Sequence, residues 1–164
     1  CSAHVLAQEP VTVDRIIAAA VRIKAEVVTA DEREGDLRRI LNFGHTVGHA
    51  LEAETYYERF LHGEAVAFGM HVATALAEDV AQLTRADAAQ IHAVIRKYGP
   101  IPPVDGVAPA SLFARLAADK KTVQGQVHFV LPITIGAVKI VTGVEDRAVM
   151  KAIEGVLARF VAPK

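Results

Sequence analysis

Residues 37–51 of this 164-residue chain read Leu37-Arg38-Arg39-Ile40-Leu41-Asn42-Phe43-Gly44-His45-Thr46-Val47-Gly48-His49-Ala50-Leu51. The apolar residues recur at helical spacing, which predicts a helix from Leu37 to about Ala53 with Asp36 as its N-cap. Because a helix turns about 100° per residue, this one would carry a narrow polar stripe opposite an apolar side. The stripe consists of Arg38, Asn42, His45 and His49. The helix is therefore expected to pack on one side and present functional groups on the other.

Two features of this segment are costly for an ordinary helix. Gly44 and Gly48 would lie in the helix interior, where each glycine costs about 1 kcal/mol relative to alanine. Their spacing would let another backbone or a ligand approach closely. Arg38 and Arg39 fall in the first turn, where the helix dipole disfavours cations. A bound anion would reverse that cost, so the segment favours an anion site.

Three histidines are candidate metal ligands. His45 and His49 are four residues apart, so both can reach one metal ion from a helix. His62 begins the next predicted helix in the run His62-Gly63-Glu64 and could meet His45 across the helix pair. The alternative, a solvated helix face with incidental Arg and His, stays open. The other histidines are expected to be surface or packing residues; they are His4, His71, His92 and His128.

The rest of the chain predicts a mainly α-helical fold with one small β hairpin. Helical periodicity and capping signals predict further helices at residues 12–29, 62–79, 85–98, 109–119 and 145–160. Alternating apolar residues over 127–142 predict the hairpin. With no repeat and no internal boundary, residues 1–164 are expected to form a single helical domain.

The composition narrows the classes of function. With 18 basic and 19 acidic residues, the net charge is -1, which gives no field that would recruit nucleic acid or an anionic membrane. A single cysteine, Cys1, excludes an internal disulfide and fits a reducing compartment. The sequence has no apolar run long enough to span a membrane, so a soluble, cytoplasmic protein is expected. Hydrophobic residues make up 52%, which fits either an Ala-rich helical domain or a face buried against something outside this chain.

Several ordered motifs resemble those of the 3-dehydroquinate synthases of the shikimate pathway. The first is residues 41–50, quoted above, and the second is Leu61-His62-Gly63-Glu64-Ala65-Val66-Ala67. Lys24-Ala25-Glu26-Val27-Val28, Asp31-Glu32-Arg33-Glu34 and Leu37-Arg38 precede them, and Asp119-Lys120-Lys121 comes before the hairpin. The resemblance covers nearly the whole chain.

The resemblance implies a metal- and substrate-binding helical domain with assigned residues. His45 and His62 would be two of three protein ligands to a divalent metal, zinc or cobalt, and the third ligand would be a Glu that lies before this region. The catalytic, substrate-contacting residues would be Lys24, Arg38, Asn42, His49 and Lys120, with Lys121 as the second choice of the lysine pair. Cations, amide and imidazole suit a substrate that carries a carboxylate and a phosphate.

The reaction implied is the conversion of the seven-carbon sugar acid phosphate DAHP into 3-dehydroquinate and phosphate. Bound NAD would oxidise one hydroxyl, phosphate would be eliminated, and NADH would return the hydride before ring closure. In the family, NAD is bound by an N-terminal α/β domain, which is expected to be absent from this chain. Alone, the chain would then bind metal weakly and not turn over, and the full-length protein would be a homodimer.

Three alternatives remain open. Another sugar phosphate cyclase would keep the metal ligands and change the residues that contact the substrate carboxylate. A metal-dependent alcohol or glycerol dehydrogenase of related fold would have no use for Lys24, Arg38 and Lys120. A non-catalytic helical dimerisation module would retain the histidines without activity.

Overall fold

The computed structural model describes residues 2–31, 37–120 and 126–161. The chain divides into two compact units, Cys1–Leu41 and Asn42–Lys164, and the second holds most of the helices and the hairpin. Within the described residues the fold is mainly helical with one two-stranded sheet, as predicted. The single domain expected over residues 1–164 stays a prediction.

The first unit is built on one long helix. After the short helix α1 (Ser2–Leu6), α2 runs over Pro10–Ala30 and confirms the predicted helix at 12–29. Pro10 suits the first position of α2, because its φ is already helical and that position needs no N–H donor. Asp31 ends the helix, and its carboxylate accepts a hydrogen bond of 2.9 Å from the backbone N–H of Arg38.

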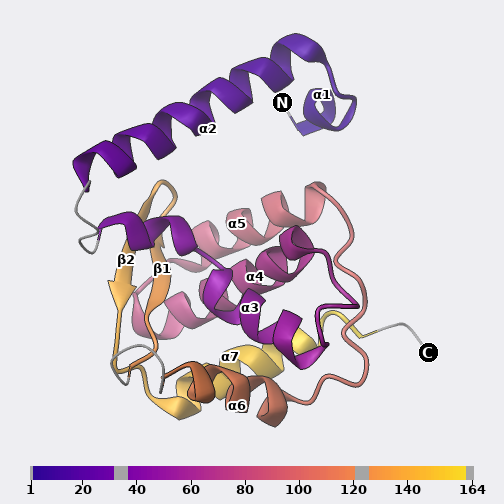
Figure 1. Cartoon of the computed structure of the whole chain (residues 1–164), viewed down its shortest axis with the longest axis vertical. Coiled ribbons are helices and arrows are strands. Elements are labelled where there is room, and N and C mark those ends of the chain that lie inside the picture. The colour runs from indigo at the N-terminus through magenta and orange to yellow at the C-terminus, as the bar shows by residue number, and fades with distance from the viewer. Residues whose placement is uncertain (1, 32–36, 121–125, 162–164) are drawn as a thin grey trace. The chain divides into compact units, whose positions relative to one another are not determined.

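The second unit is organised around one buried helix, α4 (Figure 1). α4 packs against α3, α5, α7 and the first strand, and α6 packs against α3 and α7. The helices are α3 (His45–Glu54), α4 (His62–Val80), α5 (Arg85–Lys97), α6 (Pro109–Lys120) and α7 (Asp146–Leu157). The core between them is almost wholly apolar and includes the fully buried Phe68, Leu76 and Ile153.

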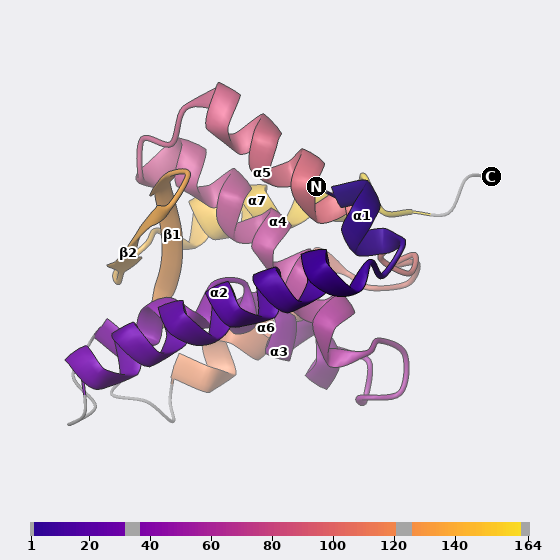
Figure 2. The same ribbon diagram turned by 90° about the horizontal axis from the view of Figure 1, so that it is seen from above.

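Local hydrogen bonds confirm two of the predicted helix starts, whereas the last helix, predicted to reach residue 160, ends at Leu157. The hydroxyl of Thr84 accepts a hydrogen bond from the N–H of Asp87 and caps α5. At the start of α4 the Glu64 carboxylate accepts the Leu61 N–H at 2.8 Å, which leaves His62 as the first helical residue. Strands β1 (Phe129–Thr134) and β2 (Ala137–Val141) pair antiparallel through a tight turn at Gly136, and the hairpin lies to one side of the helices (Figure 2).

The predicted helix from Leu37 to Ala53 is wrong in one respect. The segment is a 3-10 helix, η1 (Leu37–Asn42), followed by a break and then α3, which begins only at His45. Gly44 makes the break, since it takes the left-handed conformation with φ of 82°. The proposed N-cap, Asp36, lies outside the described residues. The single stripe is therefore also wrong: Arg38 and Asn42 belong to η1, whereas His45 and His49 share α3.

Tertiary packing explains why the helix breaks where its periodicity would continue. A Cβ atom on Gly44 would lie 2.6 Å from the Val66 carbonyl oxygen and 2.6 Å from the Met70 Cγ atom, both on α4. A Cβ on Gly69, also on α4, would collide with the Gly44 carbonyl. The backbones of the two helices are thus in direct contact at Gly44, and the glycine serves this contact and the turn together.

No helix among the described residues combines the length and the apolar character that crossing a membrane requires.

A pair of buried histidines lies between α4 and α5. The Nδ1 atoms of His71 and His92 are 2.6 Å apart, and both rings are nearly inaccessible to solvent. One ring must donate its Nδ1–H to the lone pair of the other, so the bond needs at least one neutral ring. Burial, together with nearby Arg96 and Arg159, lowers the pKa of each histidine from 6.5 to about 4. The expectation that these two are packing residues fits their position.

Replacing Gly44 with alanine should destabilise the chain by about 2–4 kcal/mol, because the left-handed backbone is strained and the new methyl group meets α4. Gly155→Ala is the matched control. Gly155 lies in α7 with open space around its missing Cβ, so the substitution should stabilise by about 0.5–1 kcal/mol. Urea unfolding followed by circular dichroism measures both, and equal effects of the two substitutions would contradict the role of Gly44.

The histidine pair should make the fold sensitive to mild acid. Because the folded pKa values lie below the unfolded value, the unfolded chain takes up protons first, and stability present above pH 6.5 is lost as the pH falls toward about 4. A loss of roughly 2–4 kcal/mol is expected over this range. His92→Asn, which keeps a hydrogen-bonding atom near the Nδ1 position but does not titrate, should lose clearly less. Urea unfolding at pH 7 and pH 4.5 tests this, and equal losses in the two proteins would contradict it.

Candidate functional site

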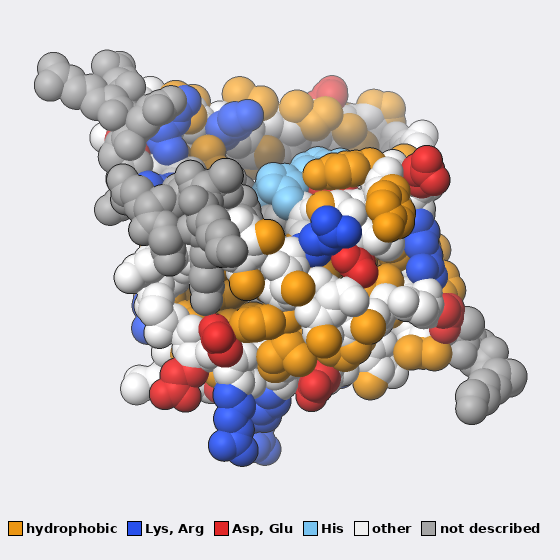
Figure 3. All heavy atoms as spheres, turned by 60° about the horizontal axis from the view of Figure 1, so that its bottom comes forward, with side chains coloured by type: hydrophobic (Ala, Val, Ile, Leu, Met, Phe, Trp, Pro, Cys, Tyr) orange, Lys and Arg blue, Asp and Glu red, His pale blue; other side chains and the backbone are white. Residues whose placement is uncertain are grey.

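Three histidine rings from two helices meet at the surface of the second unit. His45 and His49 lie on α3, and His62 begins α4. The ring centroids are 5.4 Å apart for His45 and His62, 5.5 Å for His45 and His49, and 5.6 Å for His49 and His62. Exposed histidine side chains lie side by side on the face seen in Figure 3. Three rings at the corners of a nearly equilateral triangle can direct their nitrogens toward one central ion.

Two of these rings have one nitrogen already engaged by the protein. His45 Nδ1 lies 3.3 Å from the carbonyl oxygen of Phe43, the residue before the glycine break. His62 Nδ1 lies 3.2 Å and 3.3 Å from the two carboxylate oxygens of Glu52. In each case the acceptor favours the tautomer with the proton on Nδ1, which leaves the Nε2 lone pair for a ligand. This arrangement is common for histidines that bind metal.

Glu52 is a candidate site residue that the sequence interpretation missed. It is buried near the end of α3, and ligand atoms of His49, Glu52 and His62 lie within 4.8 Å of one another. Imidazole nitrogens with a carboxylate oxygen are a donor set that zinc and similar divalent ions bind in proteins. The spacing held a signal, because Glu52 follows His49 by three residues and so shares its side of a helix.

Two of the three histidines, His49 and His62, border an open pocket with a cavity volume of about 670 Å³. It is lined by Thr46, His49, Ala50, Glu52, Ala53, Tyr57, His62, Arg115, Leu116 and Ala118. Arg115 supplies a cation at the rim; its guanidinium donates to Glu54 at 2.9 Å, and this hydrogen bond raises the pKa of Arg115. Tyr57 is exposed and has a positive φ of 60° in the turn after α3. The pocket thus combines imidazole nitrogens and a carboxylate with an arginine that is paired with Glu54.

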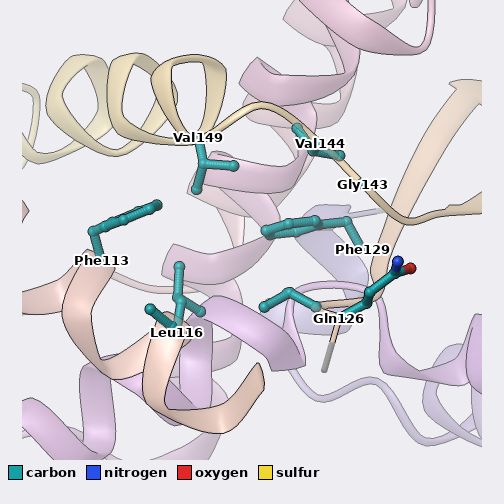
Figure 4. A pocket seen from close by; sticks show the side chains of 9 residues that line it. Phe113, Leu116, Gln126, Phe129, Gly143, Val144 and Val149 are labelled. Carbon is teal, nitrogen blue, oxygen red and sulfur yellow. The ribbon is translucent and has the colours of Figure 1, made fainter. Parts of the chain in front are cut away.

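Two other pockets lack this chemistry. The first, about 70 Å³ in volume, is walled by apolar side chains such as Phe113, Leu116, Phe129 and Val149, which point toward one another in Figure 4. The second lies between α4 and α7 beside the ion pair of Lys151 and Asp79. Neither contains a cluster of titratable groups suited to a metal, so the histidine pocket is the candidate site.

The sequence-predicted site residues fall into three groups. His45, His49 and His62 are brought together, and Asn42 lies exposed at the end of η1 in the same unit. Lys24 on α2 and Arg38 in η1 belong to the first unit. Lys120 is the last residue of α6, and Lys121 lies outside the described residues. The substrate roles of all these residues stay predictions.

Comparison with known proteins gives the family. Residues 2–122 match the family model described as 3-dehydroquinate synthase C-terminal. The 3-dehydroquinate synthase of Solibacter usitatus is 57% identical over 156 residues, which are 95% of this chain and 44% of that protein. The 3-dehydroquinate synthase of Koribacter versatilis is 47% identical over 151 residues, which are 92% of this chain and 41% of that protein. The chain therefore spans less than half the length of these relatives.

Solved structures agree with the fold. The 2-epi-5-epi-valiolone synthase of Streptomyces hygroscopicus subsp. jinggangensis, with NAD+ and Zn2+ bound, matches with a TM-score of 0.81 at 27% identity, over 96% of this chain and 45% of that one. A 2-deoxy-scyllo-inosose synthase matches with a TM-score of 0.76 at 23% identity, over 89% of this chain and 41% of that one, which supports the fold alone. Since the family model matches most of the residues, the chain belongs to the 3-dehydroquinate synthase family and carries its C-terminal region.

Proposed function

We propose that the protein containing this chain is a 3-dehydroquinate synthase, a lyase that converts DAHP into 3-dehydroquinate and phosphate. The observation that carries the proposal is the cluster of His45, His49 and His62 beside a pocket with a cationic rim. A family member 57% identical over nearly the whole chain supports the same reaction. The proposal concerns the longer protein, since this chain spans less than half of its relatives.

We assign a divalent metal, zinc or cobalt, to His45 and His62. Both rings have Nδ1 engaged and Nε2 available, which is the state that a metal ligand needs. The related cyclase structures carry Zn2+ and Co2+, which supports the choice of metal. When bound, the metal polarises a substrate oxygen as a Lewis acid and fixes the substrate in register. His49, the third ring, is then left to hydrogen bond the substrate.

We assign the remaining predicted residues to the substrate. Lys24, Arg38 and Lys120 (or Lys121) would neutralise carboxylate and phosphate, and Asn42 with His49 would orient hydroxyl groups. NAD would be held mainly by the part of the longer protein outside this chain, as the NAD+ in the related cyclases suggests. A cytoplasmic location and a homodimer stay predictions.

Another sugar phosphate cyclase is the second candidate. The valiolone synthase fold match at 27% identity favours it, but two 3-dehydroquinate synthases are 57% and 47% identical to the chain. The choice of substrate distinguishes the two functions, because a 3-dehydroquinate synthase must recognise the carboxylate of DAHP, whereas the other cyclase would act on a sugar phosphate without it.

In an assay of the full-length gene product with DAHP, NAD and zinc or cobalt, phosphate release should accompany formation of 3-dehydroquinate. Loss of a residue that only supports a metal ligand lowers activity roughly 10–100-fold. His45→Ala and His62→Ala should each lower the rate of phosphate release by more than this. The reason is that each removes a direct ligand of the metal.

His92→Asn serves as the control, because it also removes a histidine but lies in the core; at pH 7 it should keep near-normal activity. A folded, metal-loaded protein that releases no phosphate from DAHP, yet does so from a phosphorylated sugar without the carboxylate, would replace the proposal with the sister cyclase.

A further inference from the structure

We propose that Glu52 is a positioning residue that orients His62 for metal binding by accepting its Nδ1–H. This inference rests on the proposed function, in which His62 is a metal ligand. It assigns to Glu52, a residue of this chain, the task of orienting one of the proposed metal ligands.

The geometry favours a fixed contact between the two side chains. Both carboxylate oxygens of Glu52 lie at almost the same distance from His62 Nδ1, 3.2 Å and 3.3 Å. The Glu52 side chain is only 9% exposed, whereas that of His62 is 57% exposed. The buried partner can therefore hold the exposed ring by its inner nitrogen, while the opposite side of the ring stays open to solvent.

Burial and the helix dipole both make the position of Glu52 unfavourable for a carboxylate that lacks a hydrogen-bond partner. A buried carboxylate is costly without compensating hydrogen bonds. Glu52 also lies in the last turn of α3, where the helix dipole disfavours a negative charge. The backbone of Glu52 is fixed in the turn after the helix, where the backbone N–H of Tyr57 donates to the Glu52 carbonyl at 2.8 Å. The contact with His62 is the interaction that accounts for a carboxylate here.

The contact decides which ring nitrogen is free. When Glu52 accepts Nδ1–H, the Nε2 lone pair of His62 is free and lies on the opposite side of the ring from the carboxylate. His45 is arranged in the same way by the Phe43 carbonyl at 3.3 Å. The charged acceptor is the stronger of the two, so Glu52 should also make His62 a better electron donor.

Direct ligation by Glu52 is the competing role, since its oxygens lie within reach of His49 and His62 donor atoms. However, both oxygens face Nδ1 of His62. An ion held by Nε2 lies across the ring from them. For an ion on Nε2, positioning by Glu52 therefore requires no rearrangement, whereas ligation by Glu52 requires its contact with His62 to be given up.

Zinc and cobalt affinity of the full-length gene product, measured by competition with a chelator, tests the proposal. Glu52→Ala should weaken binding about 10–100-fold, the cost found for lost supporting partners of metal ligands. Glu52→Gln should weaken it less, because the amide oxygen can still accept Nδ1–H. His62→Ala should weaken it more than either, and the visible absorption of the cobalt form should change in Glu52→Ala through altered His62 geometry.

Glu54→Gln is the matched control. It removes the same negative charge from α3, but the Glu54 carboxylate accepts a hydrogen bond from Arg115 and not from His62. The metal affinity of this variant should stay normal. Normal affinity and cobalt spectrum in Glu52→Ala, with binding lost in His62→Ala, would overturn the positioning role and leave the proposed function standing. A loss in Glu52→Ala as large as in His62→Ala would make Glu52 a ligand. Absence of metal binding by the folded unsubstituted protein would overturn both proposals.

Discussion

The contact between the backbones of α3 and α4 is the constraint on which the site depends. At this contact Gly44, Gly48 and Gly69 face one another, and a Cβ atom on any of them would meet the backbone of the facing helix. Because no side chain separates the helices here, the start of α3 and the start of α4 are held close. This brings the ring centroids of His45 and His49 on α3 and of His62 on α4 within 5.6 Å of one another.

The same contact explains the break in the chain before His45. Gly44 takes a left-handed conformation that other residues adopt only at a cost, so α3 begins only at His45. The break leaves the Phe43 carbonyl beside His45, where it accepts from Nδ1. One glycine thus allows the close packing, ends the 3-10 helix and helps to set the orientation of a candidate ligand.

Burial has different effects on two polar side-chain pairs in the second unit. His71 and His92 lie inside the core, form a hydrogen bond with each other, and are kept neutral by burial. Glu52 and His62 form a pair with one buried and one exposed member, so the exposed ring keeps a nitrogen for an outside ligand. The first pair affects stability toward acid, and the second affects the site.

Local signals in the sequence determined most of the elements and the types of residue at the site. The helical spacing of apolar residues predicted α2, α4, α5, α6 and α7, and Thr84 marked the start of α5 correctly, because these signals act over a few neighbouring residues. The histidine spacing likewise indicated the cluster. Only the tertiary structure decided where the helix around Gly44 breaks and that Glu52 joins the site. Both depend on α4, which is at least ten residues away in sequence. Its packing against Gly44 overrides the local helical preference. Its first residue, His62, lies beside the buried carboxylate of Glu52 on α3.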